Sequence, residues 1–109
     1  MRILWKKELL VGDNSEGTST FNIKLNNNED YTSSTEDVYV QVEDNITMRV
    51  QGFVEDDLKG QDITLVKFDD LSTVPYATQK GVYLILASAY EKLHFDFEGK
   101  SKVVIKGCD

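Results

Sequence analysis

Residues 38–50 read VYVQVEDNITMRV, and this stretch decides the fold class. Val38, Val40 and Val42 alternate with Tyr39 and Gln41, and after a polar turn the alternation resumes from 46 to 50. Strict alternation is typical of a β-strand with one buried face, because successive side chains point to opposite sides. The stretch therefore predicts two strands joined by a turn.

The same pattern recurs along most of the chain, and further strands are expected at 3–11, 20–25, 63–68, 82–86, 93–97 and 103–105. Residues 82–86 are continuously apolar, which is typical of a strand buried on both faces. The helix-friendly residues 87–92 are predicted to form a turn or a single helical turn. About seven strands separated by turns predict an all-β fold, a single antiparallel β-sandwich domain spanning 1–109, of jelly-roll or Ig-like type.

Two hairpins follow from matching apolar faces, since a slip of one residue turns every side chain over. One closes around Glu43-Asp44-Asn45 and the other around Gly99-Lys100-Ser101. The predicted pairs are Val42 with Ile46, Val40 with Met48, Val38 with Val50, Phe97 with Val103, and Phe95 with Ile105.

Length and charge limit the classes of function. A chain of 109 residues with 40% hydrophobic residues has material for one modest core. A net charge of −7 argues against nucleic-acid binding, which needs clustered cations. The longest apolar run, 82–87, is too short to cross a bilayer, and no apolar region of a signal peptide follows the early basic residues. We therefore expect neither nucleic acid nor membrane as a partner.

No set of residues resembles an active site, so we predict no enzyme, no catalytic residue, no cofactor and no metal centre. The carboxylates at 55–57 and 69–70 lie in polar turns, where both members of a pair stay ionised. His94, Asp96 and Glu98 share one strand face at a spacing of about 7 Å, too wide to converge on one ion. Ser88 lacks a glycine elbow, and Cys108 is expected to be a frayed terminal thiol.

Two acidic loops, 13–16 and 28–30, carry oxygen ligands that suit calcium. Neither matches the EF-hand pattern, which has a central glycine and a terminal glutamate. Calcium binding by these loops stays open from the sequence.

Several aromatic residues are not claimed by the predicted core. Exposed aromatic side chains serve in protein contacts or as platforms on which sugars stack. The candidate interaction surface consists of Trp5, Tyr39, Phe53, Tyr76 and Tyr90.

The order of features from Val38 to Gly107 resembles a family of known proteins. A strand ending Met48-Arg49-Val50-Gln51-Gly52 precedes an acidic turn, a later strand opens Gly81-Val82-Tyr83, and a valine-rich strand with glycine closes the chain. This order is similar to small β-sandwich accessory proteins of tailed-phage particles, of the head-decoration, fibre or tail class. The chain departs from the family pattern at 87–90, where Ala-Ser-Ala-Tyr replaces a glycine-aromatic pair.

The resemblance implies a virion component, made in the host cytoplasm, that contacts other virion proteins and copies of itself as a homo-oligomer. It carries over no catalytic residues. An alternative is a carbohydrate-binding or host-surface adhesion module of the same fold, with a glycan as its ligand. A third is a small bacterial domain that shares only the fold, since fold does not fix function.

Overall fold

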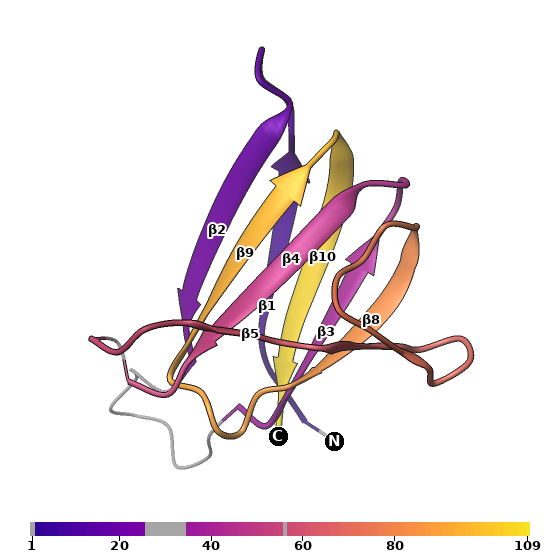
Figure 1. Ribbon diagram of the computed structural model, residues 1–109. Helices are drawn as coiled ribbons and strands as arrows, with labels where there is room; N and C mark the ends of the chain where they lie inside the picture. Colours follow the sequence, from indigo (N-terminus) through magenta and orange to yellow (C-terminus); the bar gives the residue numbers. More distant parts are fainter. Residues whose placement is uncertain (1, 26–34, 56) are drawn as a thin grey trace.

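Two antiparallel β-sheets pack face to face in a computed structural model that describes residues 2–25, 35–55 and 57–109 (Figure 1). The strands are β1 (Ile3–Val11), β2 (Thr18–Lys24), β3 (Asp37–Val42), β4 (Thr47–Phe53), β5 (Gln61–Asp62), β6 (Leu65–Lys67), β7 (Thr73–Val74), β8 (Gly81–Leu86), β9 (Lys92–Glu98) and β10 (Ser101–Cys108). The six-stranded sheet has the order β1-β10-β3-β8-β6-β7, and the four-stranded sheet has the order β2-β9-β4-β5. The described residues form no helix, and so none long and apolar enough to span a bilayer.

The strand pairs define the topology. β1 pairs with β10, β2 with β9, β3 with β8 and β4 with β5, so the first part of the chain pairs with the last in reverse order. Successive pairs alternate between the two sheets. This arrangement is a two-stranded ribbon wrapped around one core, which is the strand order of a jelly roll.

The sandwich has ten strands, not the seven predicted. Seven of the ten are long, with six to nine residues each, and they match strands expected from the sequence. The strand predicted at 63–68 is confirmed only over Leu65–Lys67, because the chain changes sheets just before it. β5 belongs to the four-stranded sheet and β6 to the six-stranded sheet, with the buried Ile63 between them. Residues 87–90 form the expected turn, in which the Tyr90 amide donates to the Ala87 carbonyl at 3.0 Å.

Both predicted hairpins are wrong. β3 and β4 lie in different sheets, and so do β9 and β10. Each connection crosses the sandwich instead of turning back within a sheet. The buried side chains of β3 therefore face those of β4 across the core, which satisfies the same matching of apolar faces. In their place, Val42 pairs with Val103 and Phe97 pairs with Met48.

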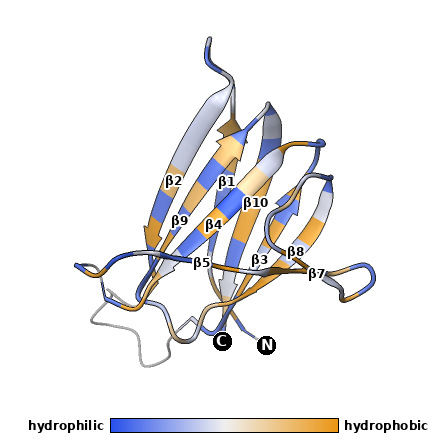
Figure 2. Cartoon of the chain, viewed as in Figure 1, coloured by the Kyte–Doolittle hydropathy of each residue, from blue (hydrophilic) through white to orange (hydrophobic). Residues whose placement is uncertain are grey.

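The core fills the space between the sheets with alternate side chains from both. Phe95, at its centre, is fully buried and lies 6.0 Å from Phe97 and 6.1 Å from Phe21, measured between ring centroids. Alternating bands of apolar and polar residues run along β4 and β9 in Figure 2. One face of each of these strands is buried and the other is polar, as the sequence pattern predicts.

The crossings at one end of the sandwich are held together at Gly12. Its φ is +70°, and a Cβ at this position would lie 2.0 Å from the carbonyl oxygen of Gly99. The Gly12 amide donates to Ser19 Oγ at 2.7 Å, and Lys100 Nζ lies 3.2 Å from Asp13 Oδ1. The loop after β1 and the connection before β10 therefore meet backbone to backbone.

We predict that Gly12→Ala lowers the free energy of unfolding by about 3 kcal/mol, combining left-handed backbone strain with overpacking. Gly17→Ala is the matched control, since its φ is +68° but nothing lies within 4 Å of its Cβ position. In the control, the free energy of unfolding should fall only by the cost of left-handed backbone strain, about 1–2 kcal/mol. Urea denaturation measures both variants, and equal losses would contradict the proposed backbone contact.

Candidate functional site

The outer face of the six-stranded sheet, the face turned away from the core, is apolar along β8 and carries both apolar and charged side chains on β1, β3 and β10. In β8, Tyr83 and Ile85 point into the core, so the alternate residues point outward, and Leu86 is 63% exposed. No helix or third layer covers this face among the described residues. Its apolar side chains, drawn from four strands and the turn after β6, are Ile3, Leu10, Tyr39, Phe68, Val82, Leu84, Leu86 and Val104.

This finding corrects the expectation that 82–86 is buried on both faces. In a two-layer sandwich each sheet has only one covered side, so a continuously apolar strand exposes every second side chain. The colouring of β8 in Figure 2 is apolar along most of the strand. Apolar patches that stay uncovered in a folded chain mark contact sites for other molecules.

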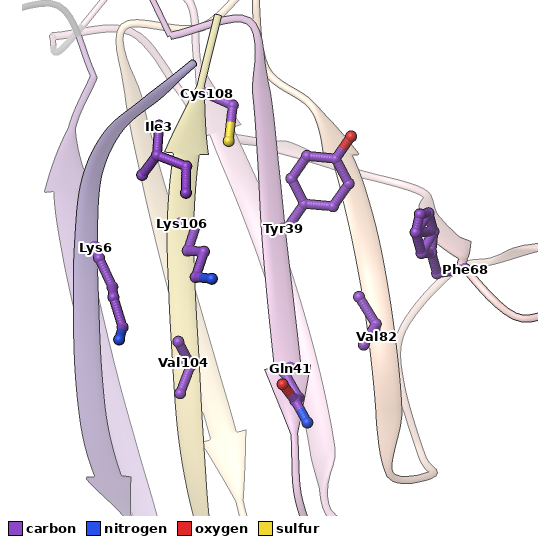
Figure 3. Close-up of a pocket in the computed structure, with 9 residues that line it drawn as sticks. All are labelled: Ile3, Lys6, Tyr39, Gln41, Phe68, Val82, Val104, Lys106 and Cys108. Carbon is purple, nitrogen blue, oxygen red and sulfur yellow. The ribbon is translucent and has the colours of Figure 1, made fainter. Parts of the chain in front are cut away.

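A depression of about 550 Å³ lies on this face (Figure 3). Five strands or their ends contribute to it: β1, β3, β8, β10 and the end of β6. Its wall is made partly by Tyr39 and Phe68, whose rings meet edge to face with centroids 5.8 Å apart. The lining side chains are Ile3, Lys6, Tyr39, Gln41, Phe68, Val82, Val104, Lys106 and Cys108.

The side chains of two lysines line this depression. Lys6 of β1 is directly opposite Lys106 of β10 in the sheet register. Like charges at directly opposed positions are unfavourable. Lys6 Nζ lies 3.0 Å from Glu8 Oε1, and this contact lowers the pKa of the Glu8 carboxyl. Lys106 forms no ion pair with any described residue. The depression therefore combines an apolar floor with two lysines, of which Lys6 is paired with Glu8 and Lys106 is not.

Cys108 is not the frayed thiol that its place in the sequence predicts. It is the last residue of β10, paired with Ile3 on one side and Asp37 on the other, and is 2% exposed. Because β10 pairs with β1 on one side and with β3 on the other, its last residue is held in the sheet. Burial, and next the nearby Asp37 carboxylate, raise the pKa of the Cys108 thiol.

The five aromatic residues predicted as one interaction surface do not lie together. Only Tyr39 lines the depression. Trp5 and Tyr90 pack against the core. The Trp5 ring covers Gly107, where a Cβ would lie 2.1 Å from its Cε2, and its Nε1 donates to Thr35 Oγ1 at 3.0 Å.

Phe53 and Tyr76 belong to the other side of the molecule. Lys92 Nζ lies 4.3 Å from the centre of the Phe53 ring, and Arg49 Cζ lies 3.9 Å from that of Tyr76. Both cations come from the four-stranded sheet, on β9 and β4. These two aromatic rings therefore flank the outer face of the four-stranded sheet.

That face is polar, in contrast to the first. His94 Nδ1 lies 2.6 Å from Asn22 Oδ1, and His94 Nε2 lies 3.1 Å from Asp96 Oδ1. Arg49 is opposite Asp96 in the register. No three His, Cys, Asp or Glu side chains in the described ranges are grouped to hold a metal ion.

Of the two acidic loops, the one at 13–16 belongs to the described residues. In the loop at 13–16, Asn14 Oδ1 accepts hydrogen bonds from the amides of Glu16 at 3.1 Å and Gly17 at 2.7 Å. The loop is thus closed by its own side chain. The loop at 28–30 lies outside the described residues.

The sequence reasoning missed Ile3, Val82, Leu86, Val104 and the two lysines of the depression. For Val82, Leu86 and Val104 a signal was present in the runs 82–86 and 103–105, which are apolar without a break, whereas Ile3 and the two lysines lie outside these runs. Combined with a sandwich of two layers, such runs require an outer face that is apolar.

A solved structure similar to this chain is the crystal structure of SPBc2 prophage-derived protein YomS. The TM-score is 0.66 at 10% sequence identity, over 94% of this chain and 93% of that one. At this identity the likeness shows the fold, which the chain shares with a phage-related protein. No protein-family model matches the sequence, and neither does any curated protein.

We predict that Cys108 reacts with a thiol reagent at least about tenfold more slowly than an exposed cysteine, because reaction needs both access and thiolate. Its raised pKa keeps the thiolate fraction low until a higher pH than usual. A Cys108→Ser, Ser88→Cys double variant supplies the control, since Ser88 is exposed in the turn before β9. Equal labelling rates of the two folded proteins would contradict the placement of Cys108, and denaturant should remove the difference.

Proposed function

We propose that this chain is a non-enzymatic structural protein of a phage particle, working through protein–protein contacts. The apolar outer face of the six-stranded sheet carries the proposal. Interfaces place apolar and aromatic side chains at their centre and polar residues at their rim, and the depression lined by Tyr39, Phe68 and Val104 has that composition. Its partners would be other particle proteins and copies of itself, and its location the virion, after synthesis in the host cytoplasm.

Two further observations support this proposal. The fold is shared with a protein described as prophage-derived. The order of strands and turns from 38 to 107 resembles the accessory proteins of tailed-phage particles. The class of accessory protein, whether decoration, fibre or tail, is left open by both.

We predict that the chain is recovered at a fixed copy number in purified particles of a phage that encodes it, and that Val104→Glu removes it from them. The substitution places a charge on the apolar outer face, and burying an unpaired charge in an interface is strongly unfavourable. Quantitative mass spectrometry of the particles is the measurement.

Val54→Glu is the matched control, because Val54 is also exposed but lies in the turn after β4. Val54→Glu should melt near the temperature of the unchanged chain. Val104→Glu should melt somewhat lower, because it faces Glu8 on β1, but should stay folded in the assay. Absence of the unchanged chain from particles would contradict the proposed function. Incorporation of Val104→Glu at the normal copy number would contradict the assignment of the contact to this face.

A carbohydrate-binding or host-surface adhesion module is the second candidate. Its support is the outer face of the four-stranded sheet, which carries hydrogen-bonding side chains such as His94 and Asn22 together with the rings of Phe53 and Tyr76. Against it, a cation already lies over each ring and occupies a face on which a sugar would stack.

We predict no specific signal when the chain is applied to a glycan array. Binding that is lost in Phe53→Ala and Tyr76→Ala, and retained in Tyr39→Ala, would instead favour the second candidate.

A further inference from the structure

The turn between β6 and β7 presents an apolar tip to solvent. Leu71 is 71% exposed, more than any other large hydrophobic side chain among the described residues. Asp69 and Asp70 precede it, and both are exposed. The β6–β7 hairpin projects beyond the edge of the sandwich (Figure 2).

The tip has a fixed shape. The Leu71 amide donates to the Lys67 carbonyl at 2.8 Å. Asp70 Oδ1 accepts from the Ser72 amide at 2.9 Å and from Ser72 Oγ at 2.7 Å. A tip ordered in advance loses little entropy when it binds.

Leu71 has an unfavourable backbone conformation. Its φ is +60°, and it is the one non-glycine residue with a positive φ in the described part of the chain. Left-handed backbone is unfavourable for a leucine, and this exposed side chain gains no core packing in return. Backbone strain that no packing within the chain offsets indicates that Leu71 contacts another molecule.

The tip and the depression on the six-stranded sheet are complementary. The tip offers one leucine beside two carboxylates. The depression offers an apolar floor, with Val104 and Ile3, beside the opposed Lys6 and Lys106. A carboxylate placed between two opposed lysines would relieve their repulsion.

We propose that the β6–β7 tip of one copy inserts into the depression of a second copy, with Leu71 on the apolar floor and Asp69 beside Lys6 and Lys106. This inference rests on the proposed function, since it uses the same outer face, and it names a second copy of the chain as a partner. The tip and the depression are different surfaces of the same chain. Copies joined in one direction build a ring or a filament, whereas two copies that exchange tips close as a two-fold dimer.

The charges disfavour the alternative of two depressions packed face to face. That arrangement would bring the Lys6 and Lys106 pairs of two copies together. The contact between tip and depression is also small. One hairpin tip buries less than the roughly 1,200 Å² at the lower end of stable interfaces, so free copies associate weakly.

Sedimentation velocity over a wide range of concentration tests the proposal with two single variants. Leu71→Gly removes the apolar tip, and glycine suits the φ of +60°. Lys106→Glu reverses a charge in the depression and sets a favourable pair opposite Lys6. The unchanged chain should associate at high concentration, into dimers if two copies exchange tips and into larger species if each copy passes its tip to the next. Each variant should weaken association at least about tenfold, as loss of a central contact does, while keeping its melting temperature.

Mixing the two variants tests whether association depends on a tip of one copy meeting the depression of another. Leu71→Gly keeps an intact depression and Lys106→Glu keeps an intact tip, so the equimolar mixture should form dimers and nothing larger. A double variant, Asp69→Lys with Lys106→Glu, should recover part of the association, because the two reversed charges then attract each other although Lys6 is unchanged. Leu58→Gly and Lys59→Glu are matched controls in the turn before β5, and both should associate like the unchanged chain.

Three results would overturn the proposal: an unchanged chain that stays monomeric at every concentration, association of Leu71→Gly that equals that of the unchanged chain, or a mixture that stays monomeric. None of these bears on recovery of the chain in particles, so the proposed function is judged separately. Particles that contain the chain, together with a monomer in solution, would leave another particle protein as the occupant of the depression.

Discussion

The sharing of one core by only two sheets is the constraint on which the rest of this structure depends. Each strand presents alternate side chains to that core, and the other half must face outward. Nothing among the described residues adds a third layer over either sheet. The character of each outer face is therefore set directly by the residues between the core positions. In the four-stranded sheet those residues are polar, as in β9, whereas in the six-stranded sheet those of β8 are apolar.

The same constraint explains which predictions were right. Local sequence patterns locate a strand. Alternation found most of the seven long strands together with their buried faces, and an unbroken apolar run found β8. Neither pattern identifies the neighbour of a strand. Val42 and Ile46 both point into the core whether their strands pair within one sheet or face each other across the sandwich. The pairs that exist, such as Val42 with Val103, join residues far apart in the sequence. Short sequence patterns carry no information on such pairs.

The residues of the site were also hard to predict, because their surroundings depend on strand pairing. Aromatic side chains were selected because they are large and because the predicted core did not claim them. Trp5 and Tyr90 are in fact accommodated by glycines on neighbouring strands, Gly107 and Gly52, which leave room for their rings. Such complementarity between a ring and a distant glycine depends on register, so it became visible only with the strand pairing. The apolar runs were the better guide, because a run without alternation conflicts with a two-layer fold whatever the register.

Two local features are unfavourable for the isolated chain: the opposed lysines of β1 and β10, and the left-handed Leu71. Natural folds keep such exceptions mainly where function requires them. The net charge of the chain suggests one explanation for both features. A chain with a net charge of −7 repels its own copies at long range, which suppresses random association of the apolar face. Contact with another acidic surface then needs a local patch of positive charge, and a patch confined to one depression limits the orientations in which that contact forms. Weak contacts of fixed orientation become strong when many are made at once, as in a repeating assembly. The polar outer face of the four-stranded sheet would stay exposed in that assembly.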